Sequence, residues 1–271
     1  MPDDLRTSTP LPGVDPGRQS VKSLFKMLEV LECFSAVDRE LSVVEIARRT
    51  GMPRTTVHRI VDSLRSVGLV EQEASRERYR LGIKLFQLGN TALMNLPLYR
   101  EAPPFVDTLA KLSGEVVHLC VFDGSEMVFV ERSERSARPN NAIVTMEASP
   151  AHSTGVGKAT LAFQDEIVIE RILRQGLKRF TARTLVDPDR LRAELAQIRA
   201  RGYAVDDCEH EPDLRCVAAP IRNSAGKVFA GISVSGPCRR IPLERVEELA
   251  KLVIAHADII SVRLGHTPPR S

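Results

Sequence analysis

Long apolar runs are absent from this chain of 271 residues. No stretch approaches the roughly 18 consecutive apolar residues that a membrane-spanning helix needs. Residues 1–17 are polar and proline-rich and lack the apolar core of a signal peptide, so we expect a disordered N-terminal tail. These absences favour a cytoplasmic protein without a membrane partner, and the length suffices for two domains.

Cysteine is scarce, odd in number and scattered: there are five residues and no CxxC pair. A disulfide framework needs paired cysteines, and a zinc site needs characteristic spacings. The closest approach to a zinc-ligand set is Cys208, His210 and Cys216, which matches no standard pattern. We therefore expect reduced thiols, no bound metal and no cofactor.

A strong charge of one sign is also lacking, because the net charge is only +3. Its distribution is uneven, with 13 Lys/Arg against 9 Asp/Glu between Arg18 and Lys84, and 25 against 26 in the remainder. A local basic surplus indicates where nucleic acid is contacted. The N-terminal part is therefore the candidate for DNA binding.

Residues 41–70 have the pattern of a helix-turn-helix. Ser42 and Glu45 are spaced as a capping box, and Gly51 allows the left-handed turn that ends a helix. Pro53 can begin a second helix without losing a needed N–H. That second helix offers its first polar and basic residues to base edges; these are Arg54, Thr55, Thr56, His58 and Arg59. A helical hairpin with a solvated polar face is the alternative.

The next segment predicts the wing of a winged helix. Two short runs with apolar residues, 69–72 and 78–81, flank a polar tip and indicate a β-hairpin. Arg76 and Arg78 would line it and reach phosphates or a minor groove, unless it is only a solvated surface hairpin. We place the DNA-binding domain at residues 18–82.

The rest of the chain predicts a linker helix and an α+β domain. Residues 83–100 contain the linker, residues 101–265 the domain, and 266–271 a tail. Period-two patterns and turn residues predict strands near 115–123, 126–134, 142–148, 215–221 and 228–235, and helices near 152–163, 188–201 and from 242. Mixed helices and antiparallel strands favour a single sheet.

Two groups of residues in this domain suit a ligand. The helix that begins after Ser153 has N–H groups from Thr154 to Gly157 that favour an anion such as a carboxylate, although an ordinary serine-capped start is the alternative. Ser233 and Ser235 alternate with apolar residues, so both hydroxyls point to one face and need a ligand or a backbone partner.

Cys216 could in principle be a nucleophile served by His152 or His210. No local cysteine-hydrolase signature surrounds it. A cysteine-dependent enzyme or a small-molecule sensor that binds no DNA is therefore the alternative function.

Three motifs follow the winged helix in order: PAHSTGVGKATLA (150–162), LRCVAAPIRNSAGK (214–227) and GISVSGP (231–237). With them, the chain from about Val21 to Leu264 resembles IclR-type bacterial transcriptional regulators. The resemblance implies a winged helix-turn-helix, a linker helix and a GAF-like α/β effector-binding domain. It also implies homodimers through the DNA-binding and linker regions, often paired into tetramers.

The resemblance implies effector contacts at Asp206, Cys216, Ser233 and Ser235, and at the loop Ser153, Thr154, Gly155 and Val156. The sequence departs from the family at Arg222-Asn223, where Phe-Asp is common, and at Gly155, where Ala is usual. The implied function is a regulator, not an enzyme, that binds a double-stranded DNA operator. A small organic acid (a keto, sugar or aromatic acid) would control its action on catabolic genes.

Overall fold

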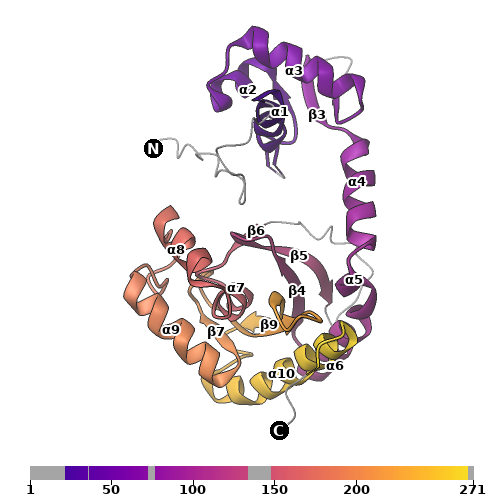
Figure 1. The fold of residues 1–271 in the computed structure, drawn as a ribbon. Helices are drawn as coiled ribbons and strands as arrows, with labels where there is room; N and C mark the ends of the chain where they lie inside the picture. Colours follow the sequence, from indigo (N-terminus) through magenta and orange to yellow (C-terminus); the bar gives the residue numbers. More distant parts are fainter. Residues whose placement is uncertain (1–21, 36, 73–76, 134–147, 268–271) are drawn as a thin grey trace. The chain divides into compact units, whose positions relative to one another are not determined.

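The computed structural model describes residues 22–35, 37–72, 77–133 and 148–267 (Figure 1). The chain divides into two compact units, Met1–Leu93 and Met94–Ser271. The division falls inside the helix that the sequence predicts as a linker. Among the described helices, none combines the length and the apolar character needed to cross a membrane.

Unit 1 is a winged helix-turn-helix. Its elements are α1 (Lys22–Glu32), β1 (Leu41–Ser42), α2 (Val43–Thr50), α3 (Arg54–Ser66), β2 (Val70–Gln72), β3 (Arg78–Leu81) and most of α4 (Ile83–Met94). The strands pair antiparallel in the order β1-β3-β2. Side chains such as Val30, Ile46, Val57 and Tyr79 form one core beneath the three helices. The predicted winged helix-turn-helix is confirmed.

Local signals determine where α2 and α3 begin and end. The Ser42 hydroxyl accepts the Glu45 N–H at 3.3 Å, and the Glu45 carboxylate accepts the Ser42 N–H at 2.7 Å. Gly51 ends α2 at a φ of 69°, which glycine adopts without steric cost. Pro53 precedes the first residue of α3. The predicted capping box and turn are therefore confirmed.

Unit 2 is built on an antiparallel sheet. Its described strands are β4 (Val116–Phe122), β5 (Glu126–Ser133), β6 (Ala148–Pro150), β7 (Ala204–Asp207), β8 (Leu214–Arg222) and β9 (Val228–Pro237), in the order β6-β5-β4-β9-β8-β7. The helices are α5 (Pro97–Glu101), α6 (Pro103–Ser113), α7 (Gly155–Leu161), α8 (Glu166–Gln175), α9 (Pro188–Arg201) and α10 (Val246–Arg263), with a 3-10 turn at Leu243–Arg245.

Helices cover both faces of this sheet (Figure 1). α6 and α10 pack on one face, and α7 lies across β7, β8 and β9 on the other. Between α7, α8, α9 and the sheet lies an apolar core that includes Val156, Ile169, Leu195 and Ala218. The predicted α+β domain with one sheet is confirmed, and α7 marks the face on which the candidate ligand residues must be sought.

Several elements differ from the sequence prediction. Pro97 and Pro103 do not interrupt helices, because each begins one, at a position where the missing N–H costs nothing. The helix α8 and the strand β7 were not predicted. Of the strand predicted at 142–148, residues 142–147 lie outside the described residues, and β6 begins at Ala148.

Candidate DNA-binding and ligand-binding sites

The first two turns of α3 expose a polar and basic face. Arg54, Thr55, His58 and Arg59 are exposed, and Thr56 is half-buried beside the core. His58 Nδ1 lies 2.9 Å from the Asp62 carboxylate. Among the described residues, neither Arg54 nor Arg59 forms an ion pair. Their guanidinium groups are therefore available for phosphates or base edges, as a recognition helix requires.

In the wing, Arg78 has a structural partner. Its guanidinium donates to the Glu40 carbonyl at 2.8 Å and lies 3.1 Å from the Glu45 carboxylate of the capping box. Hydrogen bonds from Ser42, reinforced by Arg78, lower the pKa of Glu45 to about 2. Arg78 thus ties β3 to the start of α2, and its DNA contact stays a prediction. Arg76 lies outside the described residues.

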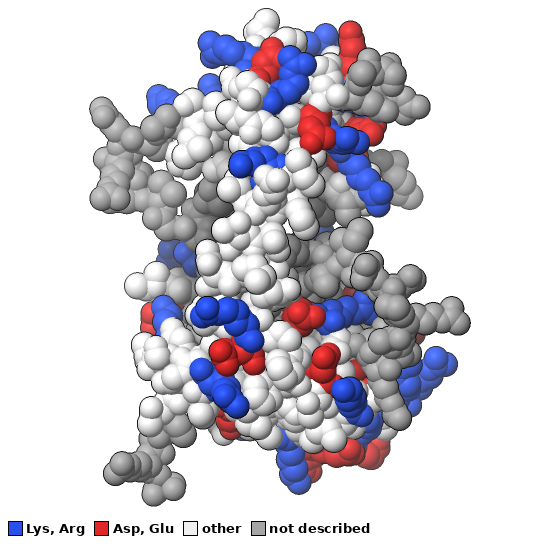
Figure 2. All heavy atoms as spheres, turned by 90° about the vertical axis from the view of Figure 1, so that its right-hand side faces the viewer, with Lys and Arg blue, Asp and Glu red and all other residues white. Residues whose placement is uncertain are grey.

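The helix α4 has no buried residue. Its exposed fractions reach 63% at Ile83, 70% at Phe86 and 53% at Leu88. Figure 2 views the side of the molecule on which α4 lies in Figure 1, and few charged side chains appear over this helix. An apolar helix without intramolecular cover has the composition of a protein interface.

In unit 2, strand register brings the predicted ligand residues together. Asp206 pairs with Cys216, and Cys216 pairs in turn with Ser235, so the three side chains share one face of the sheet. Ser233 pairs with Ala218 on the same face. All these residues except Ala218 were predicted as effector contacts.

The start of α7 lies directly over this face. A Cβ added at Gly155 would lie 3.2 Å from the Cβ of Cys216 and 3.4 Å from that of Ala218. The glycine therefore permits a closer approach of α7 to β8 than alanine would without a shift. The predicted gain in pocket space at this position is taken up by packing.

The hydrogen bonds at the start of α7 correct one detail of the sequence prediction. Thr154, not Ser153, caps the helix: its hydroxyl accepts the Gly157 N–H at 3.1 Å and donates to the Pro150 carbonyl at 2.9 Å. The Gly157 N–H was predicted to be free and is not. The Ser153 hydroxyl instead lies 3.4 Å from His210 Nδ1, which leaves Ser153 as the polar side chain of this loop.

Asp206 is a buried acid, 1% exposed. Its carboxylate accepts the backbone N–H groups of Glu209 at 2.7 Å and His210 at 3.4 Å. Burial raises the pKa of Asp206 to about 7, and the nearby Glu209 charge acts in the same direction. The side chain is thus poised between its neutral and charged forms near neutral pH.

Sequence reasoning did not assign a role to Lys158, the last residue of the SxGxGK pattern. Lys158 is 1% exposed, and its ammonium group donates to the Val205 carbonyl at 2.7 Å and to the Glu209 carboxylate. Burial raises the pKa of Glu209. Glu209 Oε2 has no hydrogen-bond partner among the described residues. Lys158 therefore neutralises a carboxylate inside the domain and does not face an external phosphate.

His118 is a second residue that sequence reasoning missed. It pairs with Ser233 across β4 and β9 and so belongs to the same face. Its ring meets Phe129 edge to face at 5.2 Å, and burial lowers the pKa of His118 to about 4. The alternation of residues 116–122 was the signal that could have placed it there. A neutral imidazole beside an aromatic ring adds a mixed polar and apolar wall to the face.

The thiol of Cys216 is unsuited to catalysis. Burial raises its pKa, and among the described residues no histidine hydrogen-bonds to it. A protonated, buried thiol is a poor nucleophile. The structure also separates the zinc-ligand set considered from the sequence, because the partner of Cys208 is Cys238 and not Cys216.

A winged helix with a free basic face, followed by a domain with a buried polar face, defines a DNA-binding regulator with an effector domain. Residues 23–74 match the IclR helix-turn-helix domain, and residues 90–262 match the bacterial transcriptional regulator IclR C-terminal domain. The chain belongs to the IclR family of bacterial transcriptional regulators.

Relatives of known function agree. The chain is 33% identical to the HTH-type transcriptional regulator KdgR of Escherichia coli (strain K12), over 93% of this chain and 96% of that protein. It is also 33% identical to the transcriptional repressor IclR of the same organism, over 96% of each chain. A crystal structure of an IclR homolog from Microbacterium hydrocarbonoxydans, complexed with 4-hydroxybenzoate, has a TM-score of 0.75 at 28% identity, over 89% of this chain and 98% of that one.

Proposed function

We propose that this regulator controls catabolic genes in response to a small organic acid bound between α7 and the sheet of unit 2. The observation that carries the proposal is the strand register, which aligns Asp206, Cys216 and Ser235 on one face beneath α7, with Ser233 beside them. The homolog bound to 4-hydroxybenzoate supports an aromatic acid as one candidate class.

The acid has a preferred orientation in this proposal. Ser153, Ser233 and Ser235 supply hydroxyl donors, so the carboxylate points toward them. Asp206, when charged, repels a carboxylate, so the remaining part of the ligand lies toward Asp206 and Cys216. Burial of the ligand charge is tolerable only with several charge-assisted hydrogen bonds, each worth roughly 1.5–3 kcal/mol.

Binding at this site would act on DNA through the assembly. α3 reads a near-palindromic operator through Arg54, Thr55, Thr56, His58 and Arg59, with Arg76 and Arg78 of the wing on the backbone. The DNA-binding form is a homodimer, which can pair into a tetramer. An acid that binds one arrangement of the dimer more tightly shifts the population of the form that binds DNA.

The experiment is a thermal-shift series with 4-hydroxybenzoate, a keto acid and a sugar acid, because a specific ligand stabilises the folded state. Calorimetry with the acid so identified should show binding weakened by about tenfold or more in Ser233→Ala and Ser235→Ala. Ser224→Ala, at an exposed turn, is the matched control. Unchanged affinity in both pocket variants would rule out this site.

A further inference from the structure

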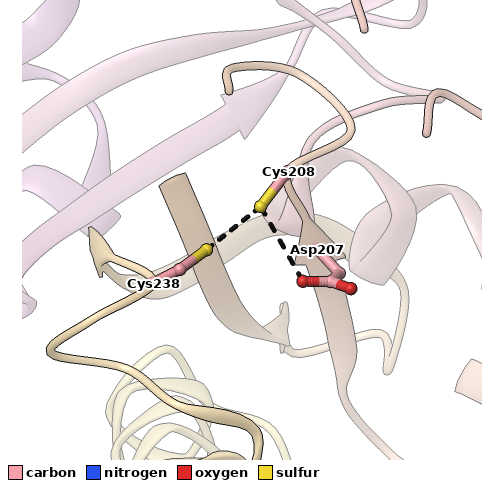
Figure 3. Close-up of side chains that lie close together, drawn as sticks. All are labelled: Asp207, Cys208 and Cys238. Atoms are coloured by element: carbon pink, nitrogen blue, oxygen red, sulfur yellow. Dashed lines mark hydrogen bonds between the residues drawn. The ribbon is translucent and has the colours of Figure 1, made fainter. Parts of the chain in front are cut away.

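Two cysteines outside the proposed ligand face lie close together. Cys208 follows the last residue of β7, and Cys238 follows the last residue of β9. Their sulfur atoms are 3.0 Å apart, and both side chains are half-buried (Figure 3). A disulfide bond is about 2.05 Å long, so closing the gap requires a movement of about 1 Å.

The backbone holds this pair in place. The Cys208 N–H donates to the Leu214 carbonyl at 3.0 Å, and the Cys238 N–H donates to the Asp213 carbonyl at 2.8 Å. Both cysteines are therefore anchored to the same two residues at the start of β8. Cys208 has a φ of 58°, a conformation that non-glycine residues rarely adopt. The approach of the two thiols is a fixed feature of the fold.

A metal site is the competing explanation, because Asp207 brings a carboxylate near both sulfur atoms (Figure 3). Both oxygens of that carboxylate are already engaged: Oδ1 accepts from Arg215 at 2.9 Å, and Oδ2 accepts from Arg183 at 2.5 Å. Two thiolates on a tetrahedral zinc, with bonds of about 2.3 Å, lie about 3.8 Å apart. The observed spacing favours a bond between the sulfurs over a shared ion.

The surroundings assign different roles to the two thiols. Burial and the hydrogen bond to Cys238 raise the pKa of Cys208 to about 11, so Cys208 keeps its proton and donates it. The positive charge of Arg215 acts on both sulfurs. Cys238 is thus the sulfur at which a thiolate is stabilised, by a neighbouring donor and a cation.

We propose that Cys208 and Cys238 are a redox-modification site that hydroperoxides convert reversibly to a disulfide. The Cys238 thiolate attacks a peroxide oxygen, and with one proton the leaving oxygen becomes water, which leaves a sulfenic acid. The Cys208 sulfur then displaces the sulfenic oxygen as a second water. In total the two thiols lose two electrons and two protons, and hydrogen peroxide is reduced to two waters.

The test uses the full-length protein, reduced and then freed of reductant. After treatment with hydrogen peroxide, remaining thiols are alkylated under denaturing conditions and counted by mass spectrometry. We expect two of the five thiols to be lost, a linked Cys208–Cys238 peptide within one chain, and recovery with dithiothreitol. Cys208→Ser and Cys238→Ser should abolish the link, whereas Cys33→Ser, a control in unit 1, should retain it.

Three results would overturn the proposal. The first is alkylation of both Cys208 and Cys238 after peroxide treatment. The second is a sulfinic acid at either position in place of the linked peptide. The third comes from dialysis against zinc alone: one bound equivalent that both serine variants lose would assign the pair to a metal.

Discussion

The ammonium group of Lys158 is held inside unit 2 by the Val205 carbonyl and the Glu209 carboxylate. Removal of one partner from a buried ion pair costs about 3–5 kcal/mol, because the remaining charge has no counter-charge. We therefore expect Lys158→Met to lower the free energy of unfolding by that amount in urea titrations. Lys158→Met/Glu209→Leu should recover much of the loss.

Lys251→Met is the matched control, since Lys251 pairs with Glu247 on the surface at 3.9 Å. Its effect should stay within about 0.5 kcal/mol, as is usual for exposed pairs. Equal effects of the two single substitutions would show that the buried pair is not special.

Asp206 gives the stability of unit 2 a pH dependence. Burial raises its pKa from 3.8 to about 7, so the folded state holds the proton more tightly than the unfolded state. The stabilisation from this group is full below pH 3.8 and is lost as pH rises through about 7, at up to about 1.4 kcal/mol per pH unit. Urea titrations between pH 5 and 8 should show a steeper loss for the wild type than for Asp206→Asn. Asp189→Asn, at an exposed site, should behave as the wild type.

At the scale of elements, α3 carries the DNA prediction. Arg59 is exposed and forms no ion pair with a described residue, so Arg59→Ala should weaken operator binding by roughly 1–3 kcal/mol and relax sequence preference. Arg65→Ala is the control, because Arg65 lies in the last turn and bonds to Gln72 at 2.8 Å. Footprinting that finds both variants equal to the wild type would remove α3 from the groove.

Elements with local signals were predictable from the sequence, whereas elements defined by distant partners were not. The capping box at Ser42, the αL glycine Gly51 and the Asp187 cap of α9 are written within a few residues of the helix they bound. The strand β7 has only four residues and is recognised through its pairing with β8.

The candidate site shows the same division. Alternation along β9 sufficed to place Ser233 and Ser235 on one face. The neighbours His118 and Lys158 required the order of strands and the position of α7, which depend on contacts far apart in sequence. The proximity of Cys208 to Cys238 likewise depends on β8 lying between them.

At the scale of the whole molecule, the exposed apolar side of α4 predicts a homodimer. Leu24 on α1 and Phe86, Leu88 and Met94 on α4 are all more than half exposed, whereas Leu31 packs on the core of unit 1. Phe86→Asp with Leu88→Asp should shift the protein to monomers in light scattering at micromolar concentration and reduce operator affinity.

Asn90→Asp adds a charge at another exposed position of α4 and serves as the control for the charge itself. A wild-type monomer that binds the full operator would contradict the dimer, as would a dimer that survives the double substitution.

The buried pair of Lys158 and Glu209 also has an evolutionary consequence. A single mutation at either position strands a charge in the interior, so most one-step changes are removed by selection. Paired replacements, such as two apolar residues of similar volume, escape this penalty. Among relatives of this chain the two positions should therefore covary, and a lineage that has lost the lysine should also have lost the acid.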